Sequence, residues 1–334
     1  KGADVDFGTL FTLYSLSVAF YMPTLALSNS VAYTALDKAG LDTIRTFPPI
    51  RIFGTIGFIC SMWVVDLLGL QNNYGQFFAC AIIGVAYGVY ALTLPECPTS
   101  KGDNAKSLVE ALGLRAFTLF KQKKMAVFFI FSMLLGVSLQ ITNGFANPYI
   151  SSFGSIPEYA GTFGVQHANI LISLSQISET LCILLIPFFL KRFGIKQVML
   201  IAMLAWVLRF GLFGMGNPGS GVWMFVLSMI VYGVAFDFFN ISGSLFVEQE
   251  TSSSIRASAQ GLFFMMTNGL GAIIGGYASG AVVDAFSVYA DGKLVSREWP
   301  EIWLIFAAYA LVIGILFALV FKYKHRPEEA VNKK

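Results

Sequence analysis

The sequence predicts an all-α polytopic membrane protein. Hydrophobic residues make up 56% of its 334 residues, and the mean hydropathy is +0.70. Charged residues make up 12%, about half of the roughly 25% that is typical of soluble domains. The apolar residues are grouped in runs that are long enough to cross a bilayer as helices. This composition excludes a water-soluble globular protein.

Nine apolar segments have the length expected of membrane-spanning helices. A polar linker at 96–124 separates the first three segments from the last six. Within the linker, the spacing of apolar residues at 105–120 predicts an amphipathic helix that lies along the membrane surface. The nine predicted spans cover residues 7–36, 47–70, 74–95, 125–150, 164–190, 195–216, 221–249, 256–285 and 299–322.

The distribution of basic residues predicts the orientation of these helices. If the helices alternate in direction, most of the 22 Lys and Arg residues fall on one side of the membrane, including those in the linker and after Phe321. Basic loops face the cytoplasm. We therefore expect the linker and the C-terminal tail, residues 324–334, to be cytoplasmic, and Lys1 to lie outside.

The helix count indicates an incomplete repeat. Three helices before the linker and six after it fit a transporter built from two six-helix halves, of which the first three helices are missing. Residues 1–95 would then be a partial N-terminal helical bundle, and residues 125–323 a complete C-terminal bundle. A genuine nine-helix protein is the alternative.

Three predicted spans each contain a pair of polar residues near the middle of the membrane. These pairs are Gln140 with Asn143, Gln176 with Glu179, and Asp237 with Asn240. Residues three apart lie on the same face of a helix. An ionisable residue at this depth costs at least about 2.5 kcal/mol and is functional by default. The matched patches predict one shared, water-accessible cavity.

The chemistry of this set favours a neutral, hydroxyl-rich solute that bears amide groups. Amides both donate and accept hydrogen bonds, and carboxylates accept them from hydroxyls; Phe236, Phe238 and Phe239 are available for stacking. The multiple cations expected of a site for phosphates are absent from the set. For the amides, interhelical hydrogen bonding, typically worth about 0.6 kcal/mol, is an equally good alternative.

The two carboxylates are also the candidates for proton coupling. A carboxyl group removed from water can bind and release a proton near neutral pH. Glu179 and Asp237 fit this role. A sodium site usually recruits backbone carbonyls from broken helices, which the sequence does not clearly show.

Two arginines fall within predicted spans. Arg51 shares a helical face with Thr55, which favours a position facing the cavity, but it lies about one turn inside the cytoplasmic end, so snorkelling to the surface is a competing account. Arg209 lies late in its span, near the outer face, and we expect it to snorkel or to form a structural pair.

Several motifs that are typical of enzymes are missing from the sequence. It contains no Walker sequence, no paired-histidine metal motif and no Gly-x-Ser-x-Gly. We therefore expect no enzyme activity, no metal and no cofactor. A membrane-embedded sensor or scaffold is the alternative from a different functional class.

The order of several motifs resembles a known family. The segment 47–58, with Arg51 ahead of Gly54 and Gly57, is similar to the start of the fifth helix in major facilitator permeases, including those for lactose and other oligosaccharides. Together with the segments below, it resembles the bacterial nucleoside:proton symporter family. These segments are 21–24, 139–143, 175–181, 235–243 and 255–261.

The resemblance implies a twelve-helix major facilitator fold, of which the fourth to twelfth helices are present here. It implies a monomeric nucleoside:proton symporter of the bacterial inner membrane that works by alternating access, contacts lipid and binds no nucleic acid. An oligosaccharide:proton symporter is the alternative. The substrate-binding residues that the resemblance implies are Arg51, Thr55, Gln140, Asn143, Gln176, Glu179, Phe236, Asp237 and Asn240.

Overall fold

The structure is a computed structural model that describes residues 6–41, 43–71, 73–94, 114–252, 255–290 and 293–323. For some helical residues, including Arg51, the structure describes the backbone and not the side chain. The chain divides into two compact units, Lys1–Asp103 and Asn104–Lys334.

The first unit contains three helices, α1 (Phe7–Lys38), α2 (Thr43–Leu67) and α3 (Gly75–Ala91). Glycine ends the first two of them. Gly40 has φ 68°, and Leu41 donates its N–H to the carbonyl of Leu36. Gly69 has φ 63° at the corresponding place after α2. Such left-handed glycines close helices because they allow the chain to turn back onto the last carbonyls.

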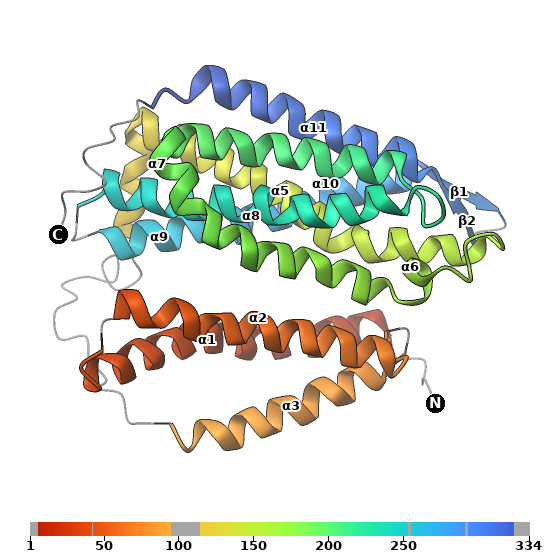
Figure 1. The fold of residues 1–334 in the computed structure, drawn as a ribbon, viewed down its shortest axis with the longest axis horizontal. Helices are drawn as coiled ribbons and strands as arrows, with labels where there is room; N and C mark the ends of the chain where they lie inside the picture. Colours follow the sequence, from red (N-terminus) through yellow and green to blue (C-terminus); the bar gives the residue numbers. More distant parts are fainter. Residues whose placement is uncertain are drawn as a thin grey trace. The chain divides into compact units, whose positions relative to one another are not determined.

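The second unit is a helical bundle (Figure 1). Its long helices are α5 (Lys123–Ser152), α7 (Ala168–Met215), α8 (Val222–Glu250) and α11 (Trp299–Val320). Short elements connect or extend these helices: η1 (Leu114–Lys121), η2 (Phe153–Ser155), α6 (Phe163–Gln166), α9 (Arg256–Phe264), a π-helix η3 (Met265–Leu270), α10 (Gly271–Ala285), and the antiparallel strands β1 (Ser287–Ala290) and β2 (Lys293–Arg297).

Helix α7 consists of two helical segments joined at a sharp bend. Its 48 residues would extend about 72 Å at 1.5 Å per residue, more than twice the roughly 30 Å of a bilayer core. Gly194, with φ 77° and ψ 168°, breaks the helix. The break separates residues 168–193 from 195–215, as Figure 1 shows, and this agrees with the two spans predicted there.

Five described helices are long and apolar enough to cross a membrane, judged by length and composition. They support a multi-pass helical membrane protein. The predicted number of nine spans stays a prediction. The five helices are Lys123–Ser155, Ala168–Met215, Val222–Glu250, Ser258–Ala285 and Trp299–Val320, and three shorter apolar helices are Phe7–Tyr21, Ile52–Leu67 and Gly75–Ala91.

The predicted surface helix at 105–120 differs from the structure where it can be compared. Residues 105–113 lie outside the described residues, and η1 is a 3₁₀ helix. Ala116 and Leu119 are buried in the core of the second unit, and the ring of Phe120 lies 5.4 Å from that of Phe129. A spacing of three matches the 3₁₀ repeat, and this face packs against the core of the second unit, whereas the position of the segment relative to the membrane stays a prediction.

Aromatic side chains form the core at the opposite end of α5. Tyr149 donates its hydroxyl to the carbonyl of Phe213, 2.7 Å away, and its ring lies 5.1 Å from Trp299 and 5.5 Å from Trp303. Aromatic rings at these separations attract one another beyond their burial. This cluster therefore ties α5, the second half of α7 and α11 together.

The predicted span at 256–285 is interrupted by the π-helix. A Cβ at Gly136 would collide with the carbonyl oxygen of Thr267, so α5 and the π-helix are in direct backbone contact. A π-helical turn inside an α-helix is frequent at functional sites. The absence of a side chain at Gly136 is what permits this approach.

We expect Gly136→Ala to destabilise the protein by about 1–3 kcal/mol, because overpacking forces backbone shifts. The melting temperature in detergent should fall. Gly144→Ala is the matched control on the same helix, since nothing lies within 4 Å of a Cβ there. An equal melting temperature for both variants would contradict this close approach.

Candidate functional site

The first half of α7 and α8 lie side by side and run in the same direction. Ser175 Oγ donates to Met229 Sδ at 3.1 Å, and further along both helices the ring of Phe189 lies 5.0 Å from that of Phe238. Residue numbers therefore increase together along the contact. This arrangement brings side chains that are far apart in sequence to the same depth.

The two helices approach most closely at Gly233. A Cβ built there would lie 2.7 Å from the backbone carbonyl of Ser178, which is too close for any side chain. Ser178 also donates its hydroxyl to the backbone carbonyl of Ile230. Small residues at such crossings let membrane helices pack backbone to backbone. Gly233 is therefore required for this contact.

The contact places both predicted carboxylates in one neighbourhood. Glu179 follows Ser178 directly, and Asp237 lies one helical turn after Gly233 on the same face of α8. Tyr232 and Cys182 both lie in the neighbourhood of Glu179 and Asp237. Asp237 is buried, with 5% of its surface exposed, and Glu179 is half-buried.

Gln176 and an aromatic pair flank the carboxylates. Gln176 is half-buried one turn before Glu179 on α7. On α8, the rings of Tyr232 and Phe236 are stacked with centroids 5.6 Å apart and an interplanar angle of 6°. Phe236 remains half-buried, so this pair offers an aromatic face at the depth of the carboxylates.

Asn240 lies beside a small internal cavity. Its side-chain amide donates to the carbonyl of Phe236 at 3.1 Å. The cavity has a volume of about 10 Å³, enough for about one water molecule, and is lined by Leu135, Gly136, Leu139, Trp206, Ala235, Phe236, Phe239, Asn240 and Thr267. The π-helix contributes Thr267 to this group.

The predicted amides of α5 face two environments. Gln140 is half-buried, and its Cβ lies against Gly275 of α10, where an added Cβ would be 2.9 Å away. Asn143 is exposed. Further along α5, Asn147 donates to Asn169 of α7 at 2.7 Å. This last pair, which the sequence analysis missed, continues the polar face of α5.

Two predicted residues belong to the first unit. Arg51 and Thr55 are both in α2, one helical turn apart, and Thr55 is half-buried. The Arg51 side chain lies outside the described part of the chain. Its orientation, and with it the choice between the cavity and the surface, stays a prediction from sequence.

Arg209 is buried, contrary to the expectation that it snorkels. Its exposed fraction is 1%, and Nη1 donates to the Ser228 carbonyl at 2.7 Å. The guanidinium lies 4.6 Å from the centre of the Tyr232 ring and 5.1 Å from that of Phe213. The alternative expectation of a structural pair is confirmed. Arg209 thereby supports the ring on which Phe236 stacks.

The fold and the site define a multi-pass helical membrane transporter. Residues 2–326 match the model of the Nucleoside H+ symporter family. The chain belongs to this family of nucleoside permeases, which are transporters and not enzymes.

Relatives of known sequence and structure agree with this assignment. The chain is 53% identical to the xanthosine permease of Escherichia coli K12 over 97% of its length and 77% of the relative's, and 53% identical to the nucleoside permease NupG of that strain over 95% and 75%. A crystal structure of nucleoside transporter NupG superposes with a TM-score of 0.80 at 54% identity, covering 91% of this chain and 74% of that one.

We expect Arg209→Gln to lower the melting temperature in detergent. The variant loses a charged hydrogen bond, worth about 1.5–3 kcal/mol, and a cation–π contact, worth about 2 kcal/mol when desolvated. Arg192→Gln is the matched control, because Arg192 is exposed. A neutral or stabilising effect of Arg209→Gln would indicate a residue that faces lipid or the membrane surface instead.

Proposed function

We propose that the protein imports nucleosides together with protons across the bacterial inner membrane by alternating access between two helical bundles. Its family membership supports this proposal, as do the names of its relatives, which are permeases of xanthosine and of nucleosides. The observation that carries the proposal is the close crossing of two apolar helices at Gly233 and Ser178, which brings Glu179 and Asp237 to a similar depth.

The same proposal includes the finer architecture. The nine predicted spans would belong to a twelve-helix major facilitator arrangement, with the first bundle contributing residues 1–95 and the second residues 125–323. The linker at 96–124 and the tail at 324–334 would be cytoplasmic, and the protein would act as a monomer. The excess of Lys and Arg in the linker and tail supports this orientation.

The carboxylates would bind the ribose and the proton. Ionised carboxylates accept hydrogen bonds from hydroxyl groups, and nucleosides carry ribose hydroxyls. Two carboxylates in one poorly hydrated site repel each other, which favours binding of one proton to the pair. A proton shared by Glu179 and Asp237 would therefore stabilise the loaded site. The repulsion between the two carboxylates would therefore couple proton binding to substrate binding.

The base would be bound by stacking and by amides. The Tyr232–Phe236 pair presents a flat aromatic surface, and base–aromatic stacking is worth about 1–3 kcal/mol. Gln140, Asn143 and Gln176 can each donate to and accept from the polar edge of a base. Arg51 and Thr55 of α2 are proposed from the sequence as further substrate-binding residues.

Uptake of radiolabelled uridine into proteoliposomes under an imposed inward proton gradient tests the function. We expect gradient-driven accumulation, competed by unlabelled nucleosides and not by disaccharides. Glu179→Gln should weaken uridine binding about tenfold or more, because a hydrogen bond to a charged group contributes about 1.5–3 kcal/mol. It should also reduce the response to the gradient.

Glu301→Gln is the matched control, since Glu301 is an exposed acid in the first turn of α11. Its uptake should stay within about twofold of the unsubstituted protein, as exposed single charges contribute little.

Asp237→Asn distinguishes the two proposed roles of Asp237. If Asp237 carries the proton, the variant loses accumulation and retains nucleoside exchange; if Asp237 binds only the substrate, the variant loses both. Full gradient-driven uptake by Glu179→Gln would refute its role, and competition by disaccharides would favour a sugar transporter.

A further inference from the structure

The second unit contains a large cleft that is separate from the carboxylate site. It lies where α5 begins and α11 ends and has a volume of about 490 Å³, within the range of small-molecule sites. We call it the lysine cleft. Its lining residues are Lys123, Lys124, Val127, Leu319, Val320, Phe321 and Lys322.

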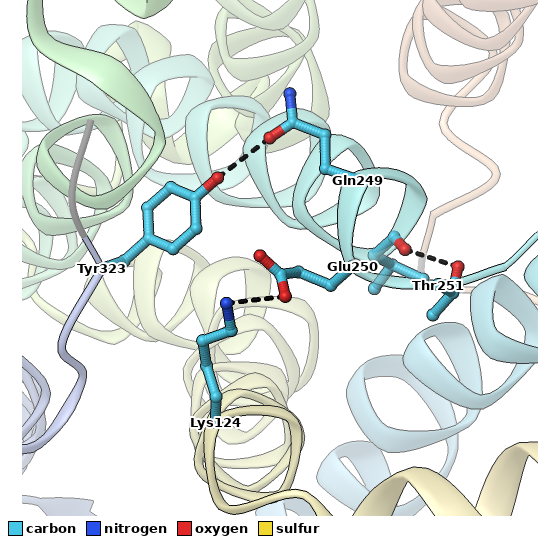
Figure 2. A network of polar contacts seen from close by, with 6 residues as sticks. Lys124, Gln249, Glu250, Thr251 and Tyr323 are labelled. Atoms are coloured by element: carbon cyan, nitrogen blue, oxygen red, sulfur yellow. Dashed lines mark hydrogen bonds and ion pairs between the residues drawn. The ribbon is translucent and has the colours of Figure 1, made fainter. Parts of the chain in front are cut away.

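One of the three lysines is fixed by neighbouring groups. Lys124 Nζ lies 2.6 Å from Glu250 Oε2 and 5.3 Å from the centre of the Tyr323 ring (Figure 2). Tyr323 in turn donates its hydroxyl to Gln249 at 2.9 Å. These contacts join the start of α5, the end of α8 and the segment after α11 beside the cleft. Glu250 compensates the charge of Lys124.

The other two lysines provide positive charge to the lysine cleft. Lys123 and Lys322 are exposed, and neither forms an ion pair with another described residue. Lys123 is also the first residue of α5, whose N-cap residue Gln122 makes no side-chain capping hydrogen bond. The N–H groups of a first helical turn and the helix dipole both favour an anion. The charges of these two lysines and the start of α5 therefore lie at the same cleft.

Apolar surface continues from the lysines into the membrane-spanning part of the cleft. Leu319 is 68% exposed and Val320 46% exposed at the end of α11, and Val127 faces them from the first turns of α5. Both helices are apolar spans that begin or end here. The cleft therefore crosses the boundary between the headgroup layer and the hydrocarbon core. Such a surface suits a ligand with an anionic head and an apolar tail.

We propose that the lysine cleft binds an anionic phospholipid of the surrounding bilayer. The phosphate lies between Lys123 and Lys322 at the start of α5, and an acyl chain lies along Val127 and Leu319. Basic pockets between membrane-spanning helices bind anionic headgroups in this way. A soluble phosphate would use the lysines alone and leave the exposed apolar surface uncovered. This inference is independent of the substrate and of the coupling ion.

Native mass spectrometry of the purified protein in a neutral detergent tests the proposal. The protein is titrated with dioleoylphosphatidylglycerol, and the bound lipid is counted in the unsubstituted chain and in Lys123→Gln/Lys322→Gln. Each lysine near an anionic surface contributes a factor of about five, so we expect affinity to fall about 25-fold in the double variant. Dioleoylphosphatidylcholine should bind both proteins weakly and equally.

Lys121→Gln/Lys191→Gln is the matched control, because it removes two exposed lysines outside the cleft. We expect it to retain its affinity for phosphatidylglycerol. Equal weakening in both double variants would overturn the site in favour of general charge attraction. Displacement of phosphatidylglycerol by millimolar glycerol 3-phosphate would overturn the lipid assignment in favour of a soluble phosphate. Unchanged melting temperatures without added lipid verify that the variants fold.

Discussion

The close crossing of α7 and α8 at Gly233 is the contact on which the candidate site depends. It requires a residue without a side chain, since an added Cβ would lie 2.7 Å from the Ser178 carbonyl. Because the two helices run in the same direction, this single contact fixes the relative depth of Glu179 and Asp237. It also places the Tyr232–Phe236 pair beside them. A wider crossing would separate two carboxylates whose proposed functions require proximity.

The cost of polar groups in a bilayer explains the arrangement around this crossing. Polar groups inside the membrane must find partners within the protein. Arg209 donates a hydrogen bond to the Ser228 carbonyl, and its guanidinium packs over two aromatic rings, one of which is that of Tyr232. The carboxylates are costly in the same way: Asp237 is buried, and Glu179 is half-buried one turn from Gln176.

The sequence predicted the features that depend on local spacing. Apolar runs predicted the long helices, and a glycine between two runs matches the bend of α7 at Gly194. The three-residue spacing of Gln176 and Glu179 correctly predicted a shared face. Contacts between residues that are distant in sequence could not be predicted from local spacing. Gly233 approaches Ser178, and Arg209 approaches Ser228, only through tertiary packing. The π-helix residue Thr267 likewise approaches Gly136 only through tertiary packing.

We propose that the α7–α8 crossing creates the nucleoside site. Isothermal titration of uridine to purified Gly233→Ala, with Gly276→Ala as the control, tests it directly. No atom lies within 4 Å of a Cβ at Gly276. We expect at least about tenfold weaker binding by Gly233→Ala in a folded, monodisperse sample, because each charged hydrogen bond is worth about 1.5–3 kcal/mol. Equal uridine affinity in both variants would contradict it.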